Sequence, residues 1–166
     1  MGGREVGGLS TTLTAHMELE KSSDVEKTQR FWKSPVIADK AGLKAIDLFQ
    51  AIHDEKIKAV WIMCTNPVVS FPDANFVKKA LDKCEFVVVS DCMEKTDTTE
   101  FADVLLPALP WAEKDGTTTS SERRISRQHA FLPAAGEAKA DWWIIAEVAK
   151  AMGIDNGFNY DSQRDI

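Results

Sequence analysis

Two short apolar segments, one helix length apart, constrain the fold of this chain more than any other feature. Residues 59–64 carry no charge and run into the polar turn 65–67, and residues 86–89 are similarly apolar before Ser90 and Asp91. Uninterrupted apolar runs of this length are typical of strands that are buried on both faces, as in a parallel sheet. Because parallel strands need a crossover connection, we expect a βαβ unit with both strands in one sheet.

Helices are predicted before and between these two strands, where apolar residues recur at helical spacing. The first helix begins near Leu43 and leads into the first strand. A capping box at residues 70–73, with Pro72 in the first turn, predicts the start of the second helix. The expected apolar stripes are positions 45, 48, 49 and 52 in the first helix and 77, 80, 81 and 84 in the second.

Three further elements follow the second strand. Residues 102–107 suit a short third strand, and the prolines at its end restrict it to the edge of a sheet. Residues 111–127 form a polar loop in which residues 122–127 are expected to pair as an edge strand. A last helix begins at Asp141 and stops at Gly153, a residue type favoured just beyond a helix end. Its predicted stripe is Trp142, Ile145, Ala146 and Ala149.

The expected fold class is therefore α/β, a Rossmann-like three-layer fold with a mostly parallel sheet and helices on both faces. A chain of 166 residues suits one well-packed domain. We divide it into an irregular lead-in segment (residues 1–41), the Rossmann-like domain (residues 42–153) and a polar tail (residues 154–166).

Charge and composition exclude several classes of function. The net charge of −6 argues against nucleic-acid binding, which needs a clustered basic excess. No segment approaches the roughly 18 apolar residues of a membrane span, and the N-terminus has no apolar signal core. We therefore expect a cytoplasmic protein, with a periplasmic location left open if the native N-terminus lies upstream. The three cysteines and three histidines show no metal-ligand spacing, so no metal ligand is expected.

The polar residues after the two strands mark a candidate ligand-binding edge. Adjacent parallel strands place Thr65 and Asn66 roughly 5 Å from Ser90 and Asp91 in the hydrogen-bonding direction. Ligands bind outside the carboxyl ends of strands in open α/β sheets. A carboxylate in this position is a frequent partner of ribose hydroxyls, and it can equally accept the paired N–H groups of a guanine.

Cations for phosphate groups are available at Lys114 and at the pair Arg123 and Arg124. The chain has neither G-x-G-x-x-G nor G-x-x-x-x-G-K-[ST], so a complete NAD, FAD or ATP site is not expected. Structural alternatives stay open: Asn66 as part of a turn signal with Pro67, Asp91 as the cap of a loop, and Asp141 as a helix N-cap.

Seven segments occur in an order that is specific when they are taken together. They are residues 3–9, 65–67 with 71–74, 89–91, 102–108, 111–117, 121–128 and 141–143. This order resembles the molybdopterin oxidoreductases, and most closely the large catalytic subunit of bacterial nitrate reductases of the assimilatory or periplasmic type. Within the matched region, Cys64 stands where glycine is common and Ser120 where asparagine is usual.

The resemblance implies that this chain is an internal Rossmann-like domain that binds part of a bis-molybdopterin guanine dinucleotide cofactor. By position, the family's cofactor contacts fall on Asn66, Ser90, Asp91, Lys114 and Asp141. The implied roles are a hydrogen bond from Asn66 to the cofactor, contact of Ser90 and Asp91 with ribose or guanine, and acceptance from guanine by Asp141. Lys114 is expected to offset pyrophosphate charge or to bind a polar edge.

The enzyme implied by the resemblance reduces nitrate to nitrite, with electrons delivered by a donor protein or subunit through a 4Fe-4S cluster. The cluster, the molybdenum ligand and the partner domains are expected elsewhere in the same large subunit, so no catalytic residue is expected in this chain. Three alternatives remain: the equivalent domain of a formate dehydrogenase, a self-standing nucleotide-binding module, and an α/β interaction domain that docks through Trp32 and Trp111.

Overall fold

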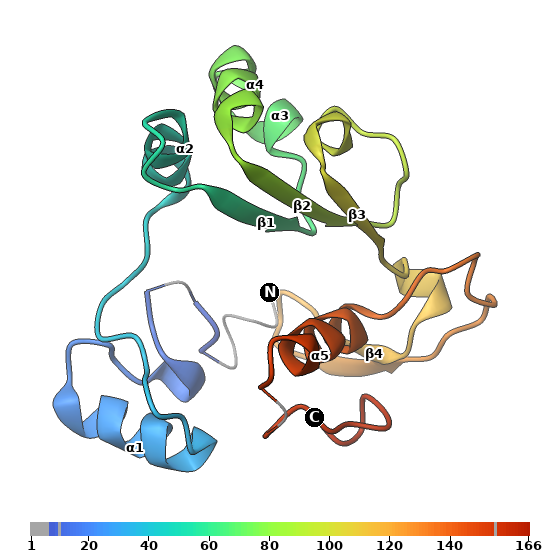
Figure 1. Ribbon diagram of the computed structural model, residues 1–166. Coiled ribbons are helices and arrows are strands. Elements are labelled where there is room, and N and C mark those ends of the chain that lie inside the picture. The colour runs from blue at the N-terminus through green and yellow to red at the C-terminus, as the bar shows by residue number, and fades with distance from the viewer. Residues whose placement is uncertain (1–6, 10, 155) are drawn as a thin grey trace. The chain divides into compact units, whose positions relative to one another are not determined.

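The structure is a computed structural model that describes residues 7–9, 11–154 and 156–166. Figure 1 shows the chain, which divides into two compact units, each of them discontinuous in sequence. The first unit is Met1–Leu43 with Gly116–Gln128, and the second is Lys44–Asp115 with His129–Ile166. All five predicted site residues belong to the second unit. The three-part division predicted from the sequence stays a prediction.

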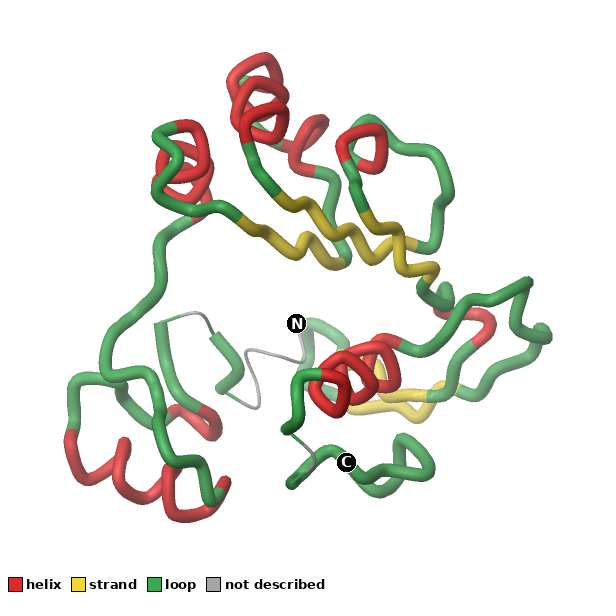
Figure 2. Tube along the Cα trace, in the orientation of Figure 1, coloured by secondary structure: helices red, strands yellow, loops and turns green. Residues whose placement is uncertain are grey.

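A three-stranded parallel sheet forms the centre of the second unit (Figure 2). Its strands are β1 (Ala59–Met63), β2 (Phe86–Asp91) and β3 (Val104–Pro107), in the order β1-β2-β3. The predicted βαβ unit is confirmed, and β3 lies at the edge to which its prolines restrict it. In the register, Met63 pairs with Ser90, so the ends of β1 and β2 lie side by side as predicted.

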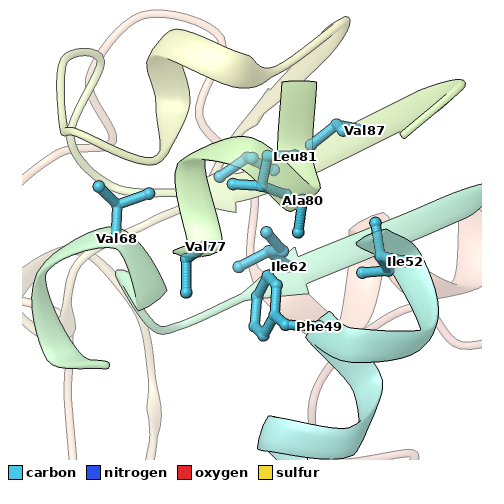
Figure 3. Close-up of a cluster of buried hydrophobic side chains, with 9 residues drawn as sticks. Phe49, Ile52, Ile62, Val68, Val77, Ala80, Leu81 and Val87 are labelled. Carbon is cyan, nitrogen blue, oxygen red and sulfur yellow. The ribbon is translucent and has the colours of Figure 1, made fainter. Parts of the chain in front are cut away.

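One face of this sheet is covered by α2 (Ala45–His53) and α4 (Ala74–Lys83) (Figure 3). The core between them is fully apolar, and Ile52, Val77 and Val89 are 0% exposed. Burying each such side chain stabilises the fold by about 1.5–3 kcal/mol. On the opposite face Trp61, Met63 and Val88 are only half-buried, so the predicted burial of both faces is only partly correct within this chain. Helix α5 (Asp141–Ala151) lies on that side of the sheet (Figure 1), which gives the predicted α/β layers.

The connection between β1 and α4 differs from the prediction. A short helix, α3 (Pro67–Ser70), follows β1 directly. Because Ser70 already belongs to α3, the predicted capping box is wrong. Asp73 is the N-cap of α4, and its carboxylate accepts the Phe76 N–H at 2.9 Å. Pro72 therefore precedes the helix instead of lying in its first turn.

Helix α5 has the predicted limits, and its predicted buried stripe is correct at Ala146 and Ala149 but not at Ile145. It buries Ile144, Ala146 and Ala149, whereas Ile145 is 40% exposed. Consecutive apolar residues near its start surround the helix, so periodicity does not specify which side is buried. Gly153 follows the helix with a φ of +79° and donates its N–H to the Lys150 carbonyl, as expected of a residue just past a helix end.

The first unit contains a 3₁₀ turn, η1 (Thr14–His16), a helix, α1 (Ser22–Trp32), and a two-stranded antiparallel hairpin. The hairpin pairs β4 (Gly116–Thr119) with β5 (Ile125–Gln128). The predicted edge strand is confirmed over β5, but the threonine run predicted as loop forms β4, in keeping with the β propensity of threonine. Residues 3–6 belong to the first of the seven segments that carry the family resemblance (residues 3–9), and they lie outside the described residues. In the described ranges, no helix is long and apolar enough to cross a membrane.

Candidate functional site

The candidate site is a cavity of about 450 Å³ at the carboxyl ends of the parallel strands. All of its lining residues belong to the second unit. The structure brings all five predicted residues to this one cavity: Asn66, Ser90, Asp91, Lys114 and Asp141. The cationic pair Arg123 and Arg124 belongs to the hairpin of the first unit, and its contact with phosphate stays a prediction.

Asn66 lies between β1 and α3, at the N-cap position of that short helix. Its backbone carbonyl accepts the N–H groups of Val69 and Ser70, so the turn predicted from the sequence is present. Its side-chain Oδ1 accepts the hydroxyl proton of Thr98 over 2.6 Å. Thr98 is 0% exposed and precedes the 3₁₀ turn η2 (Thr99–Phe101), 32 positions further along the chain. No local pattern in the sequence marks Thr98, because the residue that it contacts lies 32 positions away.

Ser90 is the penultimate residue of β2 and is 1% exposed. The Trp61 indole N–H donates to the Ser90 hydroxyl oxygen over 2.8 Å. Alternation along the strands puts Trp61 and Ser90 on the same face of the sheet, because Met63 is the register partner of Ser90. The serine hydroxyl thus accepts from Trp61 and keeps its own proton to donate.

Asp91 ends β2, where its backbone carbonyl accepts the Ala108 N–H and so joins β2 to the segment after β3. Its side-chain Oδ1 accepts the Met93 N–H at 2.9 Å, which is the loop-capping role left open as an alternative. A carboxylate has about four acceptor positions, so one such bond leaves it able to accept from hydroxyl or N–H groups of a ligand.

Lys114 and Asp141 form an ion pair inside the cavity. Lys114 follows the 3₁₀ turn η3 (Trp111–Glu113), and Asp141 is the first residue of α5. The Lys114 ammonium lies 2.6 Å from Asp141 Oδ2, and the two side chains are 32% and 27% exposed. Asp141 is not the N-cap, since Ala140 holds that position and the helix has no side-chain cap bond among the described residues. Its charge is nevertheless favourable beside the positive end of the helix dipole.

Cys64 follows β1 with a φ of +58°, in the left-handed region that glycine adopts at least cost. Glycine suits this position because it adopts a positive φ without a steric cost. The thiol lies 3.9 Å from Asp141 Oδ1. Burial raises the pKa of the Cys64 thiol, and the Asp141 charge raises it further, while the Lys114 cation acts in the opposite direction. The thiol is therefore protonated at neutral pH and is a poor nucleophile.

The set of groups in this cavity suits a nucleotide arm. One cation, two carboxylates, an amide and two hydroxyls match the phosphate, ribose and base groups of a nucleotide. A second cavity of about 470 Å³ shares four lining residues with the first, Asp91, Cys92, Ala108 and Pro110, so the two cavities adjoin along the ends of β2 and β3. Among the described residues, no group of three or more His, Cys, Asp or Glu side chains is placed to hold a metal ion.

Comparison with known proteins adds a family and several relatives. The molybdopterin oxidoreductase family model matches residues 2–151. A nitrate reductase of Klebsiella oxytoca is 52% identical over 166 residues, which cover 100% of this chain and 19% of the relative. A nitrate reductase of Shewanella frigidimarina is 51% identical, with coverage of 100% and 18%. The chain thus spans about a fifth of the length of these curated relatives.

Other relatives carry different names. The F420-dependent formate dehydrogenase subunit alpha of Methanocaldococcus jannaschii is 36% identical over 165 residues, covering 99% of this chain and 24% of the relative. Among solved structures, acetylene hydratase from Pelobacter acetylenicus matches with a TM-score of 0.66 and 26% sequence identity. That match covers 74% of this chain and 18% of the hydratase chain. The α/β fold is therefore shared with a solved protein.

Proposed function

Since the chain belongs to the molybdopterin oxidoreductase family, we propose that it is the domain of a nitrate reductase large subunit that binds one nucleotide arm of the cofactor. The family implies a molybdenum–pterin cofactor. We further propose that this cofactor is bis-molybdopterin guanine dinucleotide. The observation that carries the proposal is the convergence of five residues from four separate segments on one cavity.

Different residues of the cavity would bind different parts of the nucleotide. Asp91 and Asp141 would accept from ribose hydroxyls or from the N–H groups of guanine, and Lys114 would offset pyrophosphate charge. Asn66 and Ser90 would contact polar atoms at the ends of β1 and β2. When bound, the molybdenum–pterin group supplies the redox chemistry, while the protein binds and orients it. This chain contributes binding and orientation.

The wider assignment follows the relatives. We propose that the parent enzyme reduces nitrate to nitrite, in the cytoplasm, with electrons from a donor protein or subunit passing through a 4Fe-4S cluster held by another domain. Residues 42–153 would form the cofactor-binding domain, preceded by the lead-in segment 1–41 and followed by the tail 154–166. The nitrate reductases at 52% and 51% identity favour nitrate as substrate.

Formate is the second candidate substrate, because a formate dehydrogenase subunit is 36% identical over nearly the whole chain. The two candidates share a cofactor-binding role for this domain and differ in the reaction of the parent enzyme. Assay of the full-length enzyme with reduced viologen and nitrate, against oxidised viologen and formate, separates them. Turnover of nitrate alone is expected, and turnover of formate alone would overturn the nitrate assignment.

The cofactor-binding role is tested on the full-length enzyme with Asp141→Asn. This isosteric change removes the charge that pairs with Lys114 and would accept from guanine, so the guanine nucleotide released on acid hydrolysis should fall well below the wild-type amount. Asp47→Asn, on the exposed surface of α2, is the matched control and should retain the nucleotide. Full retention in Asp141→Asn would contradict the proposed role of this carboxylate.

A further inference from the structure

The cap of α3 is assembled in an unusual way. Asparagine is strongly preferred at helix N-caps because its side-chain oxygen accepts a free N–H of the first turn. Asn66 occupies the N-cap of α3, yet its side chain makes no such bond within the described part of the chain. The Val68 N–H instead donates to the Thr98 hydroxyl oxygen over 3.2 Å. Thr98 therefore caps the first turn of α3 in place of the Asn66 side chain.

The hydrogen-bonding capacity of the Thr98 hydroxyl determines the orientation of the Asn66 side-chain amide. A hydroxyl has one proton to donate and two lone pairs. Thr98 is 0% exposed, so solvent cannot accept its proton, and Asn66 Oδ1, at 2.6 Å, is the one acceptor bonded to it among the described residues. If the amide were turned over, its NH₂ group would face the hydroxyl and the buried Thr98 proton would lack an acceptor, which is costly. The amide oxygen therefore faces Thr98.

The consequence concerns the ligand. Because Oδ1 faces the buried hydroxyl of Thr98, the group of Asn66 that is turned away from Thr98 is the Nδ2 amide, which only donates. We propose that Thr98 is a positioning residue that turns the Nδ2 amide of Asn66 toward the ligand, so that Asn66 donates to an acceptor atom of a nucleotide and does not accept from an N–H group of guanine. This inference rests on the proposed nucleotide-binding function and adds the polarity of one contact to it.

The first experiment needs no ligand and therefore tests the orientation independently of function. In the 166-residue chain labelled with ¹⁵N, the Asn66 side-chain NH₂ should show a rigid signal, and the Val68 amide should be protected from hydrogen exchange. Thr98→Val, which keeps the shape but removes the hydroxyl, should mobilise the Asn66 side chain and abolish the Val68 protection. Thr98→Ser, which keeps the hydroxyl, should restore both signals. Thr118→Val, on the exposed hairpin strand β4, is the control and should change neither.

The second experiment measures equilibrium binding of GDP and of guanosine by calorimetry. Asn66→Asp keeps the acceptor that faces Thr98 but replaces the donor, so the affinity for GDP should fall about tenfold or more. Asn75→Asp adds the same charge on the exposed surface of α4 and should change the affinity little. Thr98→Val should lower the affinity several-fold, and Thr98→Ser should restore it. In Thr98→Val, which adds no charge, a loss for GDP alone identifies a phosphate oxygen as the acceptor, whereas a loss for both ligands identifies an acceptor atom of the nucleoside.

The outcomes separate this inference from the proposed function. If GDP binds and Asn66→Asp binds it equally well, the donor contact from Asn66 is overturned while nucleotide binding stands. If neither ligand binds the wild-type chain, nucleotide binding by this chain is contradicted, and the orientation is judged by the NMR signals alone. A mobile Asn66 side chain in the wild type, or signals that Thr98→Val leaves unchanged, would overturn the role of Thr98.

Discussion

Lys114 and Asp141 lie 27 positions apart in the sequence, yet the Lys114 ammonium is 2.6 Å from the Asp141 carboxylate. This pair fastens the first residue of α5 to the loop that follows β3. It also brings a cation and an anion to the same wall of the candidate site. The site therefore depends on contacts that the sheet alone does not provide.

Removing one member of this pair should destabilise the fold. Lys114→Met leaves a half-buried Asp141 carboxylate without its cation, and we expect a loss of about 1–2 kcal/mol in the free energy of unfolding by urea. Lys58→Met is a matched control, because the Lys58–Glu85 pair has the same 2.6 Å separation but side chains that are 68% and 63% exposed. An equal loss in both variants would show that burial contributes nothing to the Lys114–Asp141 pair.

The left-handed backbone at Cys64 predicts a stabilising substitution. Cys64→Gly should raise the free energy of unfolding by about 0.5–1 kcal/mol, because glycine relieves the strain at a φ of +58° but loses more chain entropy on folding. Cys84→Gly is the control: because Cys84 has a φ of −68°, its replacement by glycine should lower the free energy of unfolding. Urea unfolding measures both variants, and a less stable Cys64→Gly would contradict the presence of strain.

The Cys64 thiol should react slowly at neutral pH. Because burial and the Asp141 charge raise its pKa, the thiolate fraction stays low until the pH exceeds the usual range of a thiol, and alkylation by iodoacetamide should accelerate only there. Asp141→Asn removes one cause of the raised pKa and leaves the opposing Lys114 cation, so the pH profile should move to lower pH. Peptide mass spectrometry measures the rate at this cysteine. A profile that Asp141→Asn does not move would contradict the coupling.

Trp61 and Ser90 should contribute to the free energy of unfolding as a coupled pair, because a hydrogen bond joins their side chains. Trp61→Phe leaves the buried Ser90 hydroxyl without its donor, at an expected cost of about 1–3 kcal/mol in the free energy of unfolding. In a double-mutant cycle with Ser90→Ala, the two losses should not add, because either change alone removes the bond. Strict additivity would mean that this contact contributes no net stability. Trp143→Phe, at an indole that is 38% exposed, serves as the surface control.

Local sequence determined the framework of this protein. Uncharged β-branched runs and helical spacing are properties of neighbouring residues, so β1, β2 and the helices around them were predictable. The parallel pairing followed from the crossover between the strands, and with it the meeting of Asn66 and Ser90 at one sheet edge. The five candidate site residues were identified by resemblance to a family, and all of them line one cavity.

The tertiary structure decided how those residues are held. Thr98 orients Asn66 across 32 positions, Trp61 bonds Ser90 across 29, and Lys114 pairs with Asp141 across 27. None of these partners carries a local signal, because hydrogen bonds between side chains depend on the packing of distant segments. The buried face of α5 was predicted only in part for the same reason: apolar residues surround its first turns, and only the neighbouring elements select which of them are buried.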